Sequence, residues 1–407
     1  MNALSIDETW RIVTHAVAAT HATETVPLRQ AFGRCNVEDI RAGGDQPRFD
    51  SSAMDGWAVA DGAGAHEYRI VGESRAGVGF DRAIEAGEAV HISTGAVIPQ
   101  GATAIVRRER GMVRGQTLIA GEIAPGRDMR QRGCDFRKGD LLLAAGRQID
   151  HFDIARLAAS GLAHLCVARR PNLALLATGD EIVVSGAVAG PGGNYDALSP
   201  ALWARMTQLG ATITDLGVAP DHDGSIFDRA ISSDARLLIV TGGASGGRHD
   251  RVRAALGPMG LEVLVPAVRM RPGKPFWFGR WGRDGERLVV GLPGNPVAAL
   301  AALELFVVPT LMAAQGLSPV MAWRPCASMP VRAGTGGERV RFARRSGDGV
   351  DIIGMEDSAA LSPLLGANAL CRQTDFGTRM ADLLGWPASS GEDAQFSTAP
   401  SRYLASS

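Results

Sequence analysis

Three glycine- and proline-rich turns of this sequence have the residues needed to bind an anion. TGGASGGRHD spans residues 241–250, RPGKP spans 271–275 and LPGNP spans 292–296. The first and third turns follow strongly apolar runs, 237–240 and 288–290, which are typical of β-strands. An apolar strand followed by a glycine turn and a helix presents backbone N–H groups and a helix N-terminus to an anion. We therefore expect a site for a phosphate-bearing or oxyanionic ligand here.

The glycine turn itself supplies donors for such a ligand. Gly242 and Gly243 let the backbone approach a ligand closely, and Ser245 adds a hydroxyl donor. Asp250 stands near the start of the next predicted helix, and a carboxylate beside a phosphate normally needs a cation, most often Mg²⁺, between the two. A tight strand–helix turn capped by Asp250 explains the same residues without a ligand, so the turn alone is a weak signal.

Acidic side chains follow two further apolar runs. Asp180 and Glu181 follow the run 172–179, and Asp221 follows another. Because open α/β sheets bind ligands at the carboxyl ends of their strands, we expect Glu181, Asp221 and Asp250 to lie on one rim of a sheet. Three carboxylates on one rim would hold a divalent cation through oxygen ligands, although capping of a turn or helix is the alternative.

The turn RPGKP adds fixed positive charge. The Arg271 guanidinium can donate two parallel hydrogen bonds to an oxyanion, and the Lys274 ammonium can attract it as a point charge. Pro272 and Pro275 reduce the conformational entropy that is lost when this turn is held in place. We expect these two cations to stabilise an oxyanion, with a solvated basic turn as the alternative.

A central α/β domain must position these turns. Strands and helices alternate over residues 169–318, which predicts a doubly wound, largely parallel sheet. One helix is predicted at 199–209, with Ser199 as its cap and Pro200 at its first position. A long apolar helix is predicted after LPGNP, with Asn295 as its N-cap.

The rest of the chain divides into three further predicted parts. Short apolar runs alternate with glycine turns over 47–144, which predicts an inserted all-β domain. Helical spacing predicts a small N-terminal helical region from 1–46 and 145–168, and 319–407 is predicted to be a C-terminal β domain. The expected fold class is therefore multidomain α/β plus β.

Composition excludes several classes of protein. The 407 residues are 45% hydrophobic, enough for large cores, and the net charge of −1 gives no overall attraction to nucleic acid or acidic membrane. Five scattered cysteines without a CxxC pair indicate a reducing compartment. The N-terminus lacks the pattern of a signal peptide, and prolines and Glu304 interrupt the apolar stretch 288–314. We expect a cytoplasmic protein that binds neither nucleic acid nor membrane.

In their order along the chain, the motifs resemble the molybdopterin molybdenumtransferase family, the MoeA and gephyrin E-domain proteins. The resemblance runs from residue 31 to about 370 and includes FDSSAMDGWAV, STGAVIPQGATAIV, GRDMRQRGCDFRKGD, ATGDEIV, TGGASGGRHD, RPGKP and LPGNPVAA. It implies an elongated four-domain subunit and a homodimer. It also implies a reaction in which Mg²⁺ assists cleavage of adenylylated molybdopterin, AMP leaves, and molybdate is inserted at the dithiolene.

The resemblance also implies the site residues. Asp55 and Thr94 match residues that line a cleft between two subunits, and Lys274 and Pro275 match a turn that contacts molybdate. The implied catalytic residues are Asp55, Thr94, Glu181, Asp221, Asp250 and Lys274; the implied substrate-binding residues are Gly242, Gly243, Ser245, Arg271, Lys274, Pro275 and Ser362; and the implied metal ligands are Glu181, Asp221 and Asp250.

Four positions depart from the family pattern and leave other functions open. They are Leu198, Gly246, Arg248 and Ala298. Such changes are compatible with a non-catalytic carrier of molybdopterin or a scaffold for partner enzymes. Adenylylation of molybdopterin is a third hypothesis, against which the long N-terminal β region argues. The expected partners are a second copy of the chain, the adenylyltransferase, and molybdoenzyme apoproteins or their chaperones.

Overall fold

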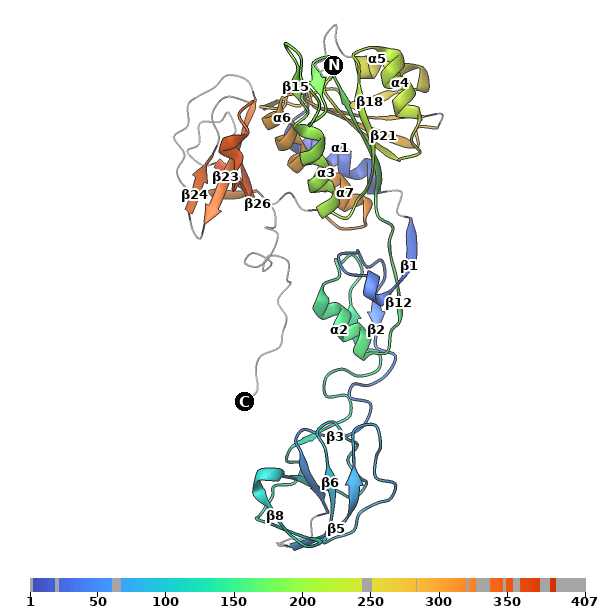
Figure 1. Ribbon diagram of the computed structural model, residues 1–407, viewed down its shortest axis with the longest axis vertical. Coiled ribbons are helices and arrows are strands. Elements are labelled where there is room, and N and C mark those ends of the chain that lie inside the picture. Colours follow the sequence, from blue (N-terminus) through green and yellow to red (C-terminus); the bar gives the residue numbers. More distant parts are fainter. Residues whose placement is uncertain are drawn as a thin grey trace. The chain divides into compact units, whose positions relative to one another are not determined.

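A computed structural model of the chain contains two compact units (Figure 1). It describes residues 3–18, 22–60, 67–243, 251–282, 284–319, 321, 323–326, 337–346, 349–353, 359–373 and 381–385. One unit is formed by Met1–Glu24 with Ala168–Ser407, and the other is formed by Thr25–Val167. The chain passes between the units within β1 (Thr23–Pro27) and β12 (His164–Ala168), which pair as a two-stranded sheet.

A six-stranded sheet forms the centre of the first unit. Its strands lie in the order β16 (Thr212–Ala219), β13 (Asn172–Thr178), β17 (Leu237–Thr241), β21 (Arg287–Leu292), β20 (Trp277–Trp281) and β18 (Glu262–Val265). The first four strands are parallel, and the last two join them in antiparallel pairs. The inner strands β13 and β17 are continuous apolar runs because both of their faces are covered. The prediction of a doubly wound, largely parallel sheet is confirmed.

Helices cover both faces of this sheet (Figure 1). Leu173 and Leu175 of β13 face a core that includes residues of α1 (Ile6–Ala18), α3 (Leu198–Gln208), α6 (Pro296–Ala302) and α7 (Val308–Ala314). Ala174 and Leu176 face the opposite core, which includes residues of α4 (Asp223–Ile231) and α5 (Arg251–Leu256). Successive side chains of a strand point to opposite faces, so one apolar strand supplies both cores.

Helix α3 begins one residue earlier than predicted. The Oδ1 atom of Asp196 accepts the N–H groups of Leu198 and Ser199 at 3.0 and 2.9 Å. The first N–H groups of a helix have no partner within the helix, and a carboxylate just before the helix satisfies them. The assignment of Ser199 as the cap, with Pro200 at the first position, is therefore wrong: Asp196 takes the capping role.

The long apolar helix after LPGNP is present. Asn295 occupies its N-cap position, although its side chain makes no capping hydrogen bond, and α6 begins at Pro296. A π-helical turn, Leu303–Val307, connects α6 to α7. The whole segment Pro296–Ala314 is long and apolar enough to cross a membrane by length and composition, but 78% of it is buried inside the structure. Such burial is typical of a core helix in a soluble protein.

The second unit contains the expected all-β domain. Its sheet has the order β7 (Ala104–Arg107), β4 (Gly56–Val59), β6 (Glu88–Ile92), β5 (Glu67–Ser74), β9 (Thr117–Ala120) and β8 (Gly111–Arg114). A smaller core beside it includes residues of β2 (Ile40–Arg41), β11 (Leu141–Leu143) and α2 (His151–Ala159). Helix α2 starts with a reciprocal capping pair, Asp150 and Asp153, which the sequence analysis had not identified.

The C-terminal sheet contains a strand from the basic turn. Strands β23 (Glu338–Ser346), β25 (Ala369–Gln373), β26 (Ala381–Gly385), β22 (Arg324–Cys326) and β24 (Gly349–Ile352) belong to it. Strand β19 (Met270–Arg271) pairs with β23 in parallel, with Arg271 opposite Arg339. RPGKP is therefore anchored in this sheet at its first residue and is not an isolated turn. The division of the chain into four parts at residues 46, 144, 168 and 318 stays a prediction.

Candidate functional site

The carboxyl ends of the four parallel strands form one rim, which comprises residues 179–181, 220–222, 242–243 and 293–295. The glycine turn lies against neighbouring backbone at this rim. Gly242 has a φ of 81°, and a Cβ atom there would stand 2.3 Å from the carbonyl oxygen of Thr178 and 3.0 Å from its Oγ1. Thr178 is 2% exposed, and its hydroxyl donates to the carbonyl of Thr241 at 3.3 Å. Glycine is required here because the two strand ends approach each other closely.

Two acids from adjacent strands meet at the rim. The backbone N–H of Asp221, which follows β16, donates to Oδ1 of Asp180, which follows β13, at 3.0 Å. The Oδ1 atom of Asp221 is buried and has no hydrogen-bond partner among the described residues. Burial, and then the charges of Asp180 and Glu181, raise the pKa of the Asp221 carboxyl. A buried carboxylate oxygen beside two further acids is an arrangement that a cation would stabilise.

Glu181 turns back toward the strand it follows. Gly179 has a φ of 144°, and a Cβ atom there would lie 2.8 Å from Oε2 of Glu181. The backbone carbonyl of Glu181 accepts the N–H of Asn194, which fixes the loop.

Of the predicted acidic trio, Glu181 and Asp221 lie near each other, while Asp250 falls outside the described residues. Ser245, Gly246 and Arg248 fall outside them as well. Within the part of the chain that the structure describes, no group of three or more His, Cys, Asp or Glu side chains is gathered closely enough to hold a metal ion. The trio of metal ligands stays a prediction.

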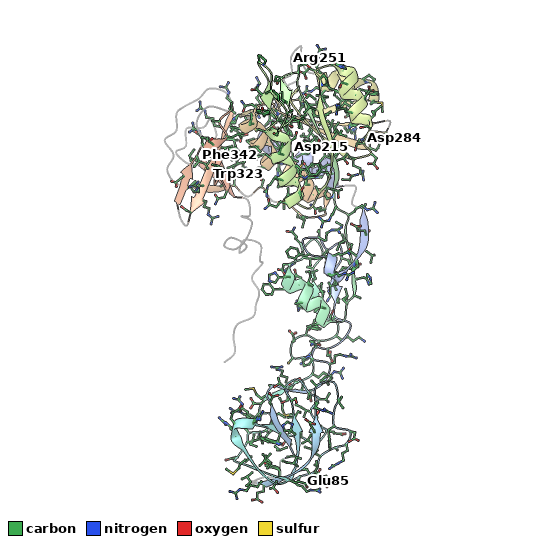
Figure 2. The ribbon with its side chains drawn as sticks, in the orientation of Figure 1. Glu85, Asp215, Arg251, Asp284, Trp323 and Phe342 are labelled. Atoms are coloured by element: carbon green, nitrogen blue, oxygen red, sulfur yellow. The ribbon has the colours of Figure 1, made fainter. Side chains whose placement is uncertain are left out.

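Arg251 lies close enough to the rim for its charge to act on Asp221, and it was not among the predicted site residues (Figure 2). It begins α5, and its Nη1 atom lies 3.9 Å from Oδ1 of Asp223 at the start of α4. Its positive charge also acts on Asp221 and lowers the pKa of that carboxyl against the larger effects of burial and the neighbouring acids. Its place directly after Asp250 at a predicted helix start was the available sequence signal.

The turn RPGKP lies against the start of α6. Gly273 has a φ of 112°, and a Cβ atom there would stand 3.6 Å from the carbonyl oxygen of Ala298. The carbonyl of Lys274 accepts the N–H of Val268 at 3.2 Å. The side chains of Arg271 and Lys274 are exposed, and neither forms an ion pair with another described residue. Their charge is therefore available to an anion.

Two of the departures from the family pattern lie in the core. Leu198 is 6% exposed and Ala298 is 4% exposed, and both face inward from helices α3 and α6. Ser362 starts a short 3₁₀ turn, Ser362–Leu364, and is exposed. No described interaction connects Ser362 with the rim, and Arg344 donates to the carbonyls of Leu365 and Gly366 instead of facing a ligand.

The β domain holds a second acid in a different environment. Oδ1 of Asp55 accepts the backbone N–H of Thr94 at 2.6 Å and its hydroxyl at 2.9 Å. The backbone bond, followed by the hydroxyl bond, lowers the pKa of Asp55. A Cβ atom on the next residue, Gly56, would lie 1.9 Å from the carbonyl oxygen of Val106, so the strand that follows this acid must begin with glycine.

The motifs around Asp55 and Thr94 are joined by backbone hydrogen bonds. Ser52 donates its N–H to Ala96 and accepts the N–H of Gly95, while Oδ1 of Asp50 accepts the N–H of Arg132 at 2.7 Å. A cavity of about 620 Å³ adjoins them. Its lining residues are Gln46, Pro47, Arg48, Phe49, Ser51, Gly95, Arg130, Cys134 and Asp135.

Comparisons with known proteins agree with this arrangement. Residues 4–161 match the model of the MoeA N-terminal region (domain I and II), and residues 174–313 match that of a probable molybdopterin binding domain. The molybdopterin molybdenumtransferase of Haemophilus influenzae is 34% identical over 301 residues, which cover 72% of this chain and 73% of that protein. Molybdopterin molybdenumtransferase 2 of Mycobacterium tuberculosis is 35% identical over 332 residues, which cover 77% of this chain and 80% of that protein.

A solved structure has the same fold over almost the whole chain. The molybdopterin biosynthesis MoeA protein from Pyrococcus horikosii superposes with a TM-score of 0.78 at 26% sequence identity, and the match covers 95% of this chain and 100% of that one. The resemblance found in the ordered motifs is thereby confirmed. The chain belongs to the molybdopterin molybdenumtransferase (MoeA) family.

Proposed function

We propose that this chain is a transferase that inserts molybdenum into molybdopterin, using molybdate and adenylylated molybdopterin as substrates and releasing AMP. The relatives named molybdopterin molybdenumtransferase support the transfer of molybdenum. The observation that carries the rest of the proposal is the rim of the central sheet, where Asp221 presents a buried carboxylate oxygen without a partner in the described structure.

The acids described at the rim supply oxygen donors for a divalent cation, but they are not gathered closely enough to hold one by themselves, so the proposed site also uses Asp250. The unpartnered Asp221 oxygen, the adjacent Asp180 carboxylate and the nearby Glu181 are hard oxygen donors of the kind that Mg²⁺ prefers. We assign Asp221 and Glu181, with Asp250, as the residues that would hold Mg²⁺, and we add Asp180. Bound there, Mg²⁺ would offset the charge of the phosphoanhydride.

The remaining site residues have roles that follow from charge and position. Arg271 and Lys274 are exposed cations on a turn anchored at both ends, so they would hold molybdate as an oxyanion, with Pro275 fixing the turn. Gly242, Gly243 and Ser245 would bind the phosphate through backbone and hydroxyl donors.

Further parts of the proposal rest on family resemblance alone. Asp55 and Thr94 of the β domain would complete the site from a second copy of the chain in a homodimer. Ser362 would add a contact from the C-terminal sheet. The same resemblance supports a cytoplasmic location, the four-part division of the chain, and exchange with an adenylyltransferase and with molybdoenzyme apoproteins or their chaperones.

The test is a single-turnover measurement of AMP release from adenylylated molybdopterin, with molybdate and Mg²⁺ added separately and together. We expect release only when both are present, and its loss in Asp250→Asn, which retains the fold because the residue is expected on a rim. Tight binding of molybdopterin without AMP release would replace this proposal with a carrier or scaffold. Formation of the adenylylated compound from ATP would replace it with an adenylyltransferase.

A further inference from the structure

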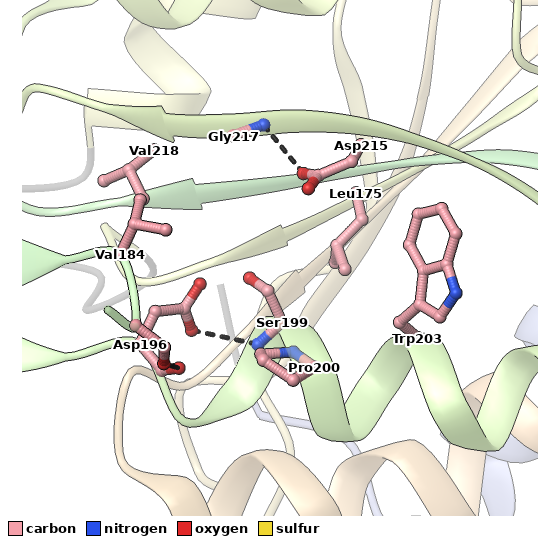
Figure 3. A pocket seen from close by; sticks show the side chains of 10 residues that line it. Leu175, Val184, Asp196, Ser199, Pro200, Trp203, Asp215, Gly217 and Val218 are labelled. Atoms are coloured by element: carbon pink, nitrogen blue, oxygen red, sulfur yellow. Dashed lines mark hydrogen bonds between the residues drawn. The ribbon is translucent and has the colours of Figure 1, made fainter. Parts of the chain in front are cut away.

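A pocket of about 170 Å³ lies between α3 and the edge strand β16, beside the rim but separate from it (Figure 3). Leu175, Val184 and Pro200 give it apolar walls, and Asp196, Trp203 and Asp215 give it polar and aromatic groups. A water molecule in the liquid takes up about 30 Å³, so the pocket has room for about six water molecules. It can hold a fused two-ring heterocycle but not a whole nucleotide-linked substrate.

The Asp215 carboxylate is fixed in place by an irregular strand. Between the paired positions Leu175–Asp215 and Ala177–Val218, β16 contains one more residue than β13, so β16 bulges at Leu216–Gly217. Gly217 has a φ of 69°, and its N–H donates to Oδ1 of Asp215 at 2.8 Å. From the opposite face, Arg229 of α4 donates to the carbonyl of Leu216. Bulges re-aim side chains beside functional sites, and this one aims an acid at the pocket.

Both carboxylates keep one oxygen available. Asp196 uses Oδ1 for the first N–H groups of α3, and Asp215 uses Oδ1 for Gly217. Their Oδ2 atoms accept no hydrogen bond from any residue that the structure describes. Trp203 is 39% exposed although it is a large aromatic residue, and its indole stands at one side of the same pocket (Figure 3). A flat ring with hydrogen-bond donors along one edge would match all three groups.

The pocket also lies at a suitable distance from the rim. Val184, which lines the pocket, stands three residues after Glu181. The N–H of Asp196 donates to the carbonyl of Val183, so the loop that contains Glu181 continues into the wall of the pocket. Asp215 stands four residues before the end of β16, which is about 13 Å at ~3.3 Å per residue. One ligand could therefore place a ring in the pocket and a phosphate at the rim.

We propose that this pocket binds the pterin ring of the substrate, an inference that rests on the proposed function. The pyrimidine edge of a pterin carries two adjacent donors, the ring N3–H and the 2-amino group. Asp215 can accept one at Oδ2 and the other at the second lone pair of Oδ1, whose first lone pair accepts the Gly217 N–H. Asp215 is the acceptor of this edge, Asp196 lies on the opposite side, and Trp203 stacks on the ring face. Adenine carries an acceptor beside its amino donor, so a carboxylate there makes one bond and faces a lone pair.

The experiment measures binding of free pterin, 2-amino-4-oxopteridine, by its fluorescence anisotropy, with adenine and AMP as competitors. In Asp215→Asn the amide oxygen can still accept the Gly217 N–H, but its NH₂ group faces the pterin donors. We expect binding to weaken about tenfold or more in this variant and to a similar extent in Trp203→Leu. Asp228→Asn, an exposed acid on α4 with no hydrogen bond or ion pair to another described residue, is the matched control and should bind as the parent chain does.

Turnover with adenylylated molybdopterin supplies a second measurement. We expect Asp215→Asn to raise KM and leave kcat within about twofold, as for a group that binds substrate and transition state equally. Unchanged pterin binding in both Asp215→Asn and Trp203→Leu, displacement of pterin by adenine, or no pterin binding by the parent chain would each overturn the assignment. If Asp215→Asn does not fold, as shown by thermal melting, the Trp203→Leu result decides.

The two proposals fail separately. A parent chain that releases AMP, but whose pterin binding does not depend on Asp215 and Trp203, keeps the proposed function and loses this pocket. A parent chain that releases no AMP, but binds pterin in a way that depends on both residues, loses the proposed function and keeps the pocket.

Discussion

Asp55 in the β domain and Asp221 on the rim of the central sheet are both predicted site acids, yet their surroundings are opposite. Asp55 receives two hydrogen bonds from Thr94, and its pKa is lowered. Asp221 has a buried oxygen with no partner in the described chain, and burial raises its pKa. The fold satisfies the charge of Asp55 by itself, whereas the ionised form of Asp221 is disfavoured until a proton or a cation binds it. Asp55 is thus suited to a fixed position, and Asp221 to binding a cation.

A third acid shows what a purely structural carboxylate looks like. Glu88 of β6 is 5% exposed and accepts hydrogen bonds from Arg82 at 2.8 and 3.1 Å and from Arg69 at 2.7 Å. The bonds to Arg82 are the largest cause that lowers its pKa to about 2. The three acids therefore form a series from Glu88, which is fully paired, to Asp221, whose Oδ1 atom has no partner among the described residues, and substitutions at each of them test that order.

The largest effect is expected at Asp221, whose Oδ1 atom lacks a partner within the described part of the chain. Asp221→Asn would remove one of the proposed cation ligands, and we expect AMP release to fall about 100-fold or more, because even the outer partners of a metal contribute about 10–100-fold. Release measured against Mg²⁺ concentration checks this. Turnover close to that of the parent chain would show that Asp221 does not hold the cation.

Asp221→Asn should lower AMP release but raise the thermal stability of the protein. A raised pKa means that the fold favours protonated Asp221, so its stabilising contribution is full below the ordinary pKa of 3.8 and is lost as pH rises through the raised value. At neutral pH without Mg²⁺, Asp221→Asn should therefore melt above the parent chain. Mg²⁺ should stabilise the parent chain and leave the variant unchanged.

An intermediate effect is expected at Thr94. Thr94→Val removes the hydroxyl donor but keeps the backbone donor, so the pKa of Asp55 should rise part of the way toward 3.8. We expect AMP release to fall about tenfold if Asp55 must be held in place. Thr94→Ser keeps the hydroxyl and is the matched control. A carboxyl NMR titration that shows no shift in Thr94→Val would contradict the role of the hydroxyl.

The smallest effect on turnover is expected at Glu88. Glu88→Gln should lower the melting temperature of the β domain at pH 7 and leave AMP release unchanged at a temperature where the protein stays folded. A lowered pKa gives stability that is present above the ordinary value of 4.5 and is lost as pH falls toward about 2. The melting difference between parent and variant should therefore disappear toward pH 2. Glu67→Gln, an exposed acid of β5, should show no such difference.

The sequence was informative wherever burial decides the structure. Strands β13 and β17 were predicted close to their observed bounds because these apolar runs between glycine turns are covered on both faces. The order of the predicted strands along the chain also places Asp180 and Asp221 at the ends of neighbouring parallel strands.

Where two nearby polar side chains can serve the same role, the sequence does not show which of them does so in the fold. Asp196 and Ser199 can both cap α3, and only the path of the preceding loop selects Asp196. The bulge at Gly217 depends on the register between two strands that are 40 residues apart at Asn172 and Thr212, and it decides which way Asp215 faces. Whether Oδ1 of Asp221 finds a partner depends on how neighbouring loops approach it, and none of the residues that the structure describes supplies one.

The pairing of β19 with β23 has a mechanical consequence. Met270 and Arg271 lie in register with Glu338 and Arg339, so the first residue of the basic turn is part of the C-terminal sheet. A displacement of β23 would therefore displace Arg271 and, with it, the turn that lies against α6. A substitution in β23 that shifts this strand, or a protein that binds the C-terminal sheet, would thus change the position of Arg271 at the proposed anion site.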